Sequence, residues 1–330
     1  MNQKSMDEKL QAIRANPHSK EFILCYAADP DMGAGINPLV GLYPSLRAYH
    51  DSLVALVEQA KLDIMLTSVS TMDVLARQLR IFDNSPVTPS VRANDATDIW
   101  TGRGFGYAKQ PSRPFATTTI EEAQFGTLHP APGQKPDVNL GLYSLTFNND
   151  FESDWFALER FKAFRIEAVQ KGFAYFLEVF NPNAPVDLKA EAIPNFVNDC
   201  IARMLAGVPQ ASRPEFLKIP YNGPKATEEL ATYTSVVVGI LGGPASTTYD
   251  SYKLIAEAKK YGARVALFGR RIKDAEDPLA FTDMLRNVAD ELIAPEEAVK
   301  AYHGALQSAG IKPKRSLADD MVIETAALKA

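Results

Sequence analysis

Residues 235–268 read SVVVGILGGPASTTYDSYKLIAEAKKYGARVALF, and the alternation inside this stretch decides the fold that we expect. A short apolar run over 235–241 is followed by helical spacing of apolar residues over 249–261 and by a second apolar run over 264–268. Apolar runs without strict alternation are typical of parallel strands that are covered on both faces. Gly262 stands where the helix should end. The stretch therefore predicts a strand–helix–strand unit.

The same alternation extends over most of the chain. Eight short apolar segments are predicted to be strands, namely residues 22–26, 62–67, 87–92, 140–147, 173–180, 215–220, 235–241 and 264–268. Helical spacing recurs between and after them, over residues 44–60, 72–81, 154–170, 195–206, 249–261, 278–288 and 296–309. A strand–helix repeat of order eight is what a (β/α)8 TIM barrel requires. The competing architecture, a doubly wound open sheet, usually has fewer strands and a glycine-rich loop after its first strand, whereas the glycine pairs here come late. We therefore expect an α/β fold of the barrel type.

One long irregular segment interrupts the repeat. We expect residues 1–20 to form an N-terminal helical extension and residues 21–330 to form a single barrel. Residues 95–139 are rich in glycine and proline and show no helix of normal length, which predicts a loop excursion after the third strand. Such a loop rises from the C-terminal face of a barrel, where active sites lie. It would act as a lid over the site or as an arm that contacts another subunit.

Composition and charge exclude several classes of protein. The 330 residues include 35 Lys and Arg against 40 Asp and Glu, a net charge of −5, and 46% of them are hydrophobic. This composition is globular, and its mild acidity argues against a nucleic-acid or membrane-surface partner. The sequence contains no apolar run of about 18 residues, so we expect no membrane span. We expect no signal peptide either, because residues 1–20 lack its apolar core. Two cysteines suit a reducing compartment, so we expect a cytoplasmic protein.

Two charged residues stand alone in apolar strands. Lys218 lies within 215–220, and Glu178 is the only charge in 173–180. Burial disfavours the charged form of an amine, and a neutral lysine is a nucleophile; the plainer interpretation is a lysine that reaches solvent at a strand edge. Glu178 is either a structural carboxylate or a proton shuttle. About 40 residues, or one strand–helix unit, separate the two, so they would lie on adjacent strands within reach of proton transfer.

Glycines follow the seventh and eighth expected strands. Gly242 and Gly243 come after 235–241, and Gly269 with Arg270 comes after 264–268. These loops of a TIM barrel commonly form a phosphate site, because glycines let backbone N–H groups approach an oxyanion. Arg270 would add charge-assisted hydrogen bonds. One Gly-Gly-Pro is often only a turn, but glycines after this particular pair of strands indicate phosphate binding.

Polar residues also follow the first and third expected strands. Arg92, Asn94 and Asp95 would recognise substrate hydroxyls or transfer protons, or they form the turn and cap networks that Asn and Asp make readily. Asp29 would bind substrate hydroxyls or cap the turn before Pro30. The four histidines show no metal-ligand spacing, so we expect no metal and no cofactor.

Three motifs together resemble a known family. They read FLKIPYNG at 216–223, GGP at 242–244 and GRRIKDAEDP at 269–278. The chain is similar there to the class I, Schiff-base aldolases of the barrel type. Within that class, the chain resembles the archaeal-type fructose-bisphosphate aldolases and the tagatose-bisphosphate and sulfofructose-phosphate aldolases. The resemblance is strongest over residues 173–290 and faint across the loop excursion.

The resemblance implies a role for individual residues. Lys218 would form an iminium with a substrate ketone, and Gly243 and Arg270, with neighbouring backbone amides, would hold a phosphate. Glu178 matches the acid/base glutamate of the tagatose-type enzymes. The archaeal-type enzymes instead use a tyrosine near the end of the fourth or fifth strand, where this chain offers Tyr143.

The residues and the resemblance together predict a lyase. We expect a class I aldolase that breaks or forms a C–C bond of a phosphorylated ketose through a Schiff base on Lys218. Two alternatives remain open: a transaldolase-like synthase of the same superfamily, and a barrel that binds phosphosugars without cleaving them. Asp29 is the best match to the family's first-strand aspartate. The expected partner is a small sugar phosphate, and the family usually forms homo-oligomers.

Overall fold

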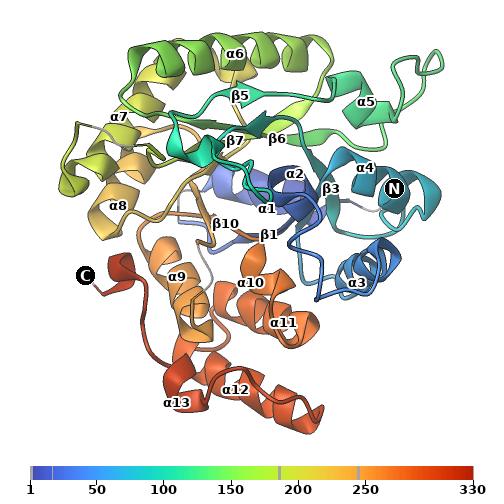
Figure 1. Ribbon diagram of the computed structural model, residues 1–330, viewed down its shortest axis with the longest axis vertical. Coiled ribbons are helices and arrows are strands. Elements are labelled where there is room, and N and C mark those ends of the chain that lie inside the picture. Colours follow the sequence, from blue (N-terminus) through green and yellow to red (C-terminus); the bar gives the residue numbers. More distant parts are fainter. Residues whose placement is uncertain (1–2, 17, 185–186, 244–245, 330) are drawn as a thin grey trace.

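Eight parallel strands form a barrel (Figure 1). The computed structural model describes residues 3–16, 18–184, 187–243 and 246–329. The barrel strands are β1 (Ile23–Ala28), β2 (Ile64–Thr67), β3 (Thr88–Arg92), β6 (Leu140–Thr146), β7 (Ala174–Phe180), β8 (Leu217–Lys218), β9 (Gly239–Leu241) and β10 (Val265–Phe268). Hydrogen-bonded neighbours follow the order β8-β7-β6-β3-β2-β1-β10-β9. The ring closes because the N–H groups of Leu217 and Ile219 donate to the carbonyls of Val237 and Gly239, at 2.8 and 3.0 Å. Seven strands fall within the segments expected from the sequence, and β1 overlaps its segment and extends two residues beyond it, so the (β/α)8 prediction is confirmed.

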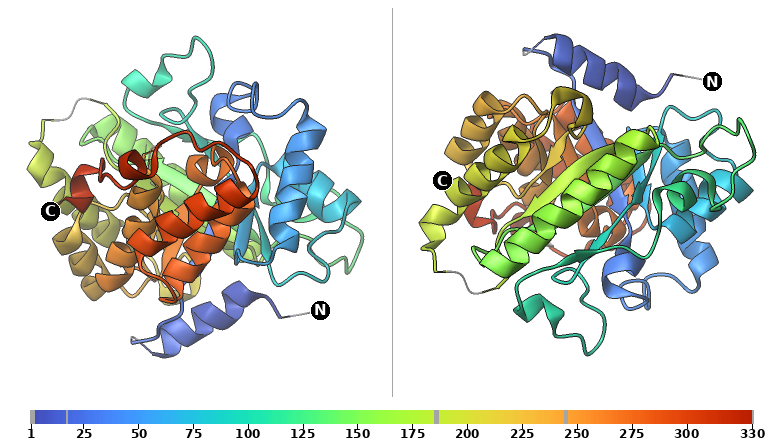
Figure 2. Two further views of the ribbon diagram at one scale, coloured as in Figure 1. Left: turned by 90° about the horizontal axis from the view of Figure 1, so that it is seen from below. Right: turned by 90° about the horizontal axis from the view of Figure 1, so that it is seen from above.

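Helices surround the strands (Figures 1 and 2). They are α2 (Pro30–Ala34), α3 (Leu46–Glu58), α6 (Phe151–Gln170), α7 (Ile193–Ala206), α8 (Pro224–Tyr233), α9 (Thr248–Lys260), α10 (Arg270–Lys273), α11 (Pro278–Ala289), α12 (Pro295–Ser308) and α13 (Leu317–Asp320). Gly262, with a φ of 99°, follows α9 as expected, because this left-handed backbone is open to glycine at little cost. Within the described ranges, every helix is too short or too polar to cross a bilayer.

Two helical segments differ from the sequence-based expectation. Instead of one α-helix over 72–81, the chain forms α4 (Val69–Met72), which continues as the π-helix η1 (Asp73–Gln78). Apolar spacing indicates a helical face but does not distinguish i→i+4 from i→i+5 hydrogen bonds. Helix α8 was not expected, because it presents only a short apolar stripe to the barrel. Its buried residues are Ala226, Thr227 and Leu230.

Apolar side chains pack in two layers. Alternate strand residues point outward against the helices, and the others fill the barrel interior. Helix α1 (Ser5–Ala15) adds Met6, Leu10 and Ile13 to the interior cluster. It lies at the N-terminal ends of the strands, because Lys9 donates to the Phe22 carbonyl, one residue before β1, at 3.2 Å.

The long segment 95–139 contains short elements of its own. Strand β4 (Asp95–Ala96) pairs antiparallel with β5 (Pro114–Phe115). The segment also contains two short helices, η2 (Tyr107–Lys109) and α5 (Ile120–Phe125). The Trp100 ring stacks on Phe115 at 5.0 Å between centroids, which joins the start of the segment to β5.

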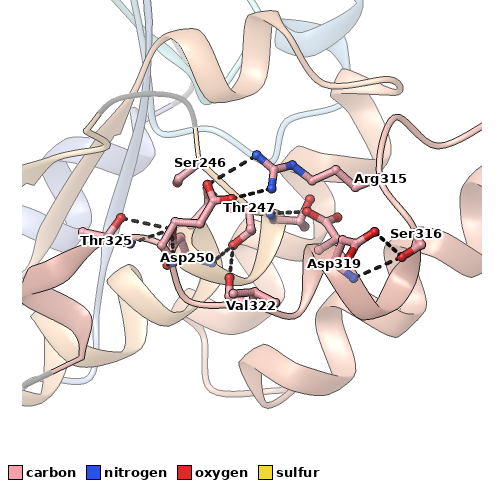
Figure 3. Close-up of polar contacts among 12 residues, drawn as sticks. Ser246, Thr247, Asp250, Arg315, Ser316, Asp319, Val322 and Thr325 are labelled. Atoms are coloured by element: carbon pink, nitrogen blue, oxygen red, sulfur yellow. Dashed lines mark hydrogen bonds and ion pairs between the residues drawn. The ribbon is translucent and has the colours of Figure 1, made fainter.

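The chain end holds the start of α9, the helix that follows the Gly242–Gly243 turn (Figure 3). Asp250 in the first turn of α9 accepts hydrogen bonds from the backbone N–H of Thr325 and from its hydroxyl, both at 3.1 Å. The Thr247 hydroxyl donates to the Val322 carbonyl at 2.7 Å. Asp320 accepts from the N–H of Thr248 at 2.7 Å. The bond to Asp320 satisfies a first-turn N–H group of α9, and the other bonds fasten residues 322–325 to the start of that helix.

Candidate active site

Three adjacent strands place three functional side chains in one row. The register pairs Ser144 of β6 with Glu178 of β7, and Glu178 with Lys218 of β8. Two residues earlier on each strand, Leu142, Phe176 and Phe216 belong to the barrel interior. Because strand side chains alternate with a period of two, the three polar residues point into the same interior.

Lys218 and Glu178 form a buried ion pair. The Lys218 Nζ lies 2.6 Å from the Glu178 Oε1, and the two side chains are 6% and 1% exposed. The other carboxylate oxygen, Oε2, accepts a hydrogen bond from the Ser144 hydroxyl at 2.6 Å. The sequence-based expectation that the lysine and the glutamate lie side by side within proton-transfer distance therefore matches the geometry.

A second ion pair adjoins the first. The Arg92 Nε donates to Asp29 Oδ2, Nη1 donates to the Ser144 hydroxyl at 2.9 Å, and Nη2 lies 3.5 Å from Glu178 Oε2. Burial raises the pKa of the Asp29 carboxyl, but Arg92 and Lys218 lower it by more, so the net shift is downward. Burial likewise lowers the pKa of Arg92, and Asp29 and Glu178 raise it by more. Carboxylates and cations thus alternate along a row of contacts from Asp29 through Arg92 and Glu178 to Lys218. Ser144 contacts the two middle members of this row.

Asn94 and Asp95 adjoin this cluster on the side away from the cavity. The Asn94 Oδ1 accepts from the Ser144 N–H at 2.6 Å, and its Nδ2 donates to the Ser144 carbonyl at 2.8 Å. Asp95 accepts from the N–H of Ala96 at 2.8 Å, and burial raises the pKa of its carboxyl to about 6. Neither residue lines the cavity that contains Lys218. Asn94 therefore holds the strand that carries Ser144.

The charged cluster opens onto a cavity of about 550 Å³. Its wall includes most of the residues singled out from the sequence: Asp29, Arg92, Glu178, Lys218, Gly242, Gly243, Gly269 and Arg270. A hollow of about 950 Å³ beside Arg14 and Val237 is larger, but Lys218 does not line it. The 550 Å³ cavity is within the range of small-molecule sites.

The glycines give the cavity wall its shape. A Cβ on Gly269 would lie 3.0 Å from the Ala27 carbonyl oxygen, and Gly243 has a left-handed φ of 70°. The Arg270 Nη2 donates to the Gly243 carbonyl at 3.3 Å, which joins the two loops. Pro244 and Ala245 of the expected glycine turn lie outside the described residues. The two loops thus meet at one side of the cavity, as the sequence predicted.

Sequence reasoning missed two residues of this site. Ser144 was overlooked in favour of Tyr143, whose ring points outward and stacks on Phe164 at 4.5 Å. Asp98 lines the cavity and accepts from the Thr146 hydroxyl at 2.6 Å. Ser144 was detectable, because it lies on the same inward face as Leu142 in a strand of alternating residues, and Asp98 belongs to the polar segment that follows the third expected strand.

This arrangement can perform proton transfer next to a nucleophile. An amine in contact with a carboxylate can lose its proton to that carboxylate without help from water. Ser144 and Arg92 hold the second carboxylate oxygen, so the Glu178 carboxylate cannot rotate away from Lys218 without breaking those contacts. Gly242, Gly243, Gly269 and Arg270 line another part of the cavity wall, where the Arg270 guanidinium can bind an anionic group.

Comparison with known proteins finds solved structures that share the barrel fold. The chain is similar to a Schiff-base-forming fructose-1,6-bisphosphate aldolase, with a TM-score of 0.62, 17% identity, and coverage of 85% of this chain and 99% of that one. An archaeal fructose-1,6-bisphosphate aldolase matches with a TM-score of 0.61 and 18% identity, over 86% of this chain and 99% of that one. A fructose-bisphosphate aldolase from Slackia heliotrinireducens matches with a TM-score of 0.65 and 15% identity, over 90% of this chain and 91% of that one. No protein-family model and no curated protein sequence matches the chain. At this identity the likeness establishes the fold, and the resemblance that the three motifs indicated is confirmed at that level.

Proposed function

We propose that the protein is a class I aldolase that cleaves or forms a C–C bond of a phosphorylated ketose. The observation that carries the proposal is the 2.6 Å contact between Lys218 Nζ and Glu178 Oε1 inside an open cavity. A buried lysine in a purely structural role needs no cavity beside it. The fold likeness to Schiff-base aldolases supports the same conclusion.

The reaction begins with proton transfer. Glu178 takes a proton from Lys218, and the neutral amine attacks the ketone carbon, whose oxygen becomes a hydroxyl by gaining that proton. Glu178 then takes a proton from the nitrogen of the adduct and donates it to this hydroxyl. The hydroxyl leaves as water while the nitrogen lone pair forms a C=N⁺ bond. General acid–base catalysis of this kind contributes about 10²–10⁴-fold to a rate.

The iminium then serves as an electron sink. Glu178 removes the proton from the hydroxyl on the far carbon of the bond to be cleaved, and a C=O bond forms at that carbon as the C–C bond breaks. The electron pair of the broken bond forms a C=C bond to the former iminium carbon, and the π pair of the C=N⁺ bond moves to the nitrogen. An aldehyde leaves and an enamine stays on Lys218. Protonation of the enamine carbon and addition of water to the resulting iminium regenerate the amine and release the second product.

Arg92 is proposed to keep Glu178 in place through these steps. Its Nη2 and the Ser144 hydroxyl both face Oε2, which leaves Oε1 turned toward Lys218. Asp29 in turn holds the Arg92 guanidinium through Nε. The glycine loops and Arg270 would bind the phosphate and so fix which carbonyl carbon lies beside Lys218.

Borohydride trapping tests the proposal directly. Ketose phosphates of each stereochemistry are incubated with the protein, sodium borohydride is added, and peptides are analysed by mass spectrometry. The expected result is a stable secondary-amine adduct on Lys218 and on no other lysine. Lys259, which is also buried but bonds to the Ala289 carbonyl at 2.8 Å, is the internal control. A set of ketoses that leaves Lys218 unmodified contradicts the proposal.

A further inference from the structure

The charges of the cavity wall distinguish its two sides. The wall contains four cations and four carboxylates, namely Arg92, Lys218, Arg270, Lys273, Asp29, Asp98, Glu178 and Asp274. Arg92 pairs with Asp29, Lys218 pairs with Glu178, and Lys273 contacts Asp274. Among the described residues, Arg270 is the one lining cation that forms no ion pair with a carboxylate.

Arg270 stands on the side where the glycine loops meet. It bonds to the Gly243 carbonyl, and it is the first residue of α10, directly after Gly269. An arginine without a carboxylate partner provides a charge for one phosphate group. The other lining cations already neutralise carboxylates, so a phosphate bound to them would have to compete with those partners.

The wall contributed by the segment after β3 has the opposite character. Asp98 lies there, and its two oxygens accept hydrogen bonds from Thr146 and Ser112 at 2.6 and 2.8 Å. A carboxylate held in this way can accept further bonds from sugar hydroxyls, but it repels a phosphate dianion. Thr101, also on this wall, adds a further hydroxyl.

We infer that the substrate is a ketose with a single phosphate, bound at Arg270, and with an uncharged hydroxylated end that faces Asp98. This inference rests on the proposed aldolase function and narrows its substrate class. The second end of the sugar is recognised by hydroxyl groups that donate to Asp98, and a phosphate there would lie against an unneutralised carboxylate.

Kinetics with matched ketoses test this inference separately from the function. Each ketose is supplied unphosphorylated, with one terminal phosphate, and with two. The expected kcat/KM is at least about tenfold higher for one monophosphate than for the other two forms. Arg270→Met should raise KM for the monophosphate by about tenfold or more and should raise KM for the unphosphorylated ketose by a smaller factor. Asp98→Asn should reduce the ratio of kcat/KM for the monophosphate to kcat/KM for the bisphosphate.

The outcomes separate the two proposals. A Schiff base on Lys218 with a bisphosphate preferred, or with no effect of Arg270→Met, overturns the single-phosphate inference and leaves the aldolase function standing. Failure of every ketose form to label Lys218 overturns the function itself, and the inference fails with it.

A second inference concerns the outer face of α6, which lies on the outside of the barrel with no other element over it (Figure 2, right). The helix buries Ser153, Ala157, Phe161 and Ala168 against the strands. Its opposite face carries large apolar side chains that are 37–78% exposed: Phe151, Trp155, Leu158, Ile166 and Val169. At 3.6 residues per turn these five residues form one straight stripe. An apolar stripe that one chain leaves uncovered indicates a contact with another molecule.

The charges within the stripe indicate the partner. Glu159 and Lys162 lie at its middle, between the apolar residues of its two ends; both are about half exposed, and they pair with each other at 2.7 Å on one side of the stripe. If two copies of α6 pack antiparallel about a twofold axis, Glu159 of each copy faces Lys162 of the other. The same register brings Trp155 against Ile166, so apolar residues on either side of the charges meet apolar residues. We propose that this face of α6 binds a second copy of the chain.

Sedimentation of charge-exchange variants tests this contact. The wild-type chain should sediment as a dimer or a larger even-numbered assembly. Glu159→Lys alone, or Lys162→Glu alone, places two like-charged pairs across the twofold axis, so the dissociation constant of the dimer should rise by about tenfold or more. The double variant restores opposite charges across the axis, so its dissociation constant should return to the wild-type value. Trp155→Glu should raise it by about 100-fold.

Exposed residues elsewhere supply matched controls. Tyr233→Glu and Leu292→Glu change side chains that are 84% and 75% exposed and lie off α6, and neither should alter the assembly. Circular dichroism confirms that each variant is folded. A monomeric wild-type chain, or an assembly that Trp155→Glu leaves intact, overturns this proposal.

Discussion

The barrel has a buried cluster of charges at each end, and the two clusters are built differently. At the N-terminal ends of the strands, Asp63 accepts from Lys9 at 2.8 Å, from Arg286 at 2.9 Å and from the Leu24 N–H at 2.8 Å. At the C-terminal ends, the Lys218–Glu178 pair lines a cavity of about 550 Å³.

The difference lies in what each cluster can still bind. Both oxygens of Asp63 are engaged by cations, and Lys9 belongs to α1, the helix that packs across this end. Lys218, in contrast, has one carboxylate partner and a cavity in front of it. Burial and ion pairing alone therefore do not identify an active site; the open space beside a reactive group does. The predictions below separate the two clusters.

The largest expected effect is on turnover. Lys218→Met removes the nucleophile, so kcat/KM for the best ketose should fall by at least about 10⁴-fold. Glu178 keeps Arg92 and Ser144 as partners, so the free energy of unfolding should change by less than about 2 kcal/mol. Steady-state kinetics and urea unfolding measure the two quantities. Residual turnover near the wild-type level would show that another residue is the nucleophile.

Glu178→Gln should have the next largest effect. The amide oxygen can still accept from Ser144, but the group no longer carries protons, so kcat should fall by about 10²–10⁴-fold. Single-turnover measurements with borohydride should show slower adduct formation at Lys218. An unchanged rate of adduct formation would assign the proton transfers to another group.

At the other end of the barrel, Asp63→Asn should affect stability and not chemistry. It leaves Arg286 and Lys9 without their shared carboxylate, which should lower the free energy of unfolding by about 3 kcal/mol. Asp283→Asn, which breaks the half-exposed pair with Lys61, is the control and should cost about 0–1 kcal/mol. The kcat of the folded Asp63→Asn protein should equal that of the wild type; a large fall in kcat would contradict the division between the two ends.

The smallest expected effect concerns Asp95, which lies behind the active-site cluster. Burial raises the pKa of this carboxyl to about 6, above its usual value, so ionisation destabilises the fold. The penalty is absent near pH 4, grows as pH rises through about 6, and is complete above that. Asp95→Asn cannot ionise and can still accept from the Ala96 N–H, so its Tm should exceed that of the wild type by about 2–4 °C at pH 8. Calorimetry at pH 8 and pH 4 tests this, and an equal gain at both values would exclude ionisation as the cause.

The local sequence predicted some parts of the site better than others. Glu178 and Lys218 were found because a lone charge in an apolar strand is conspicuous, and their spacing of one strand–helix unit predicted adjacent strands. Ser144 and Asp98 were missed because a serine in a strand and an aspartate in a loop are common in structural roles. Asn94 and Asp95 were expected at the site, but neither lines the cavity.

By itself, the sequence determined the barrel, because periodic burial of apolar residues is a local property that can be read along the chain. It also determined which strands carry the lysine, the glutamate and the glycines. Tertiary structure decided the rest. Only the pairing of β3 and β7 with opposite edges of β6 brings Arg92 to Glu178, and only the register of β6 and β7 places Ser144 against the same carboxylate. Such contacts depend on distances between segments far apart in the chain, which local patterns do not encode.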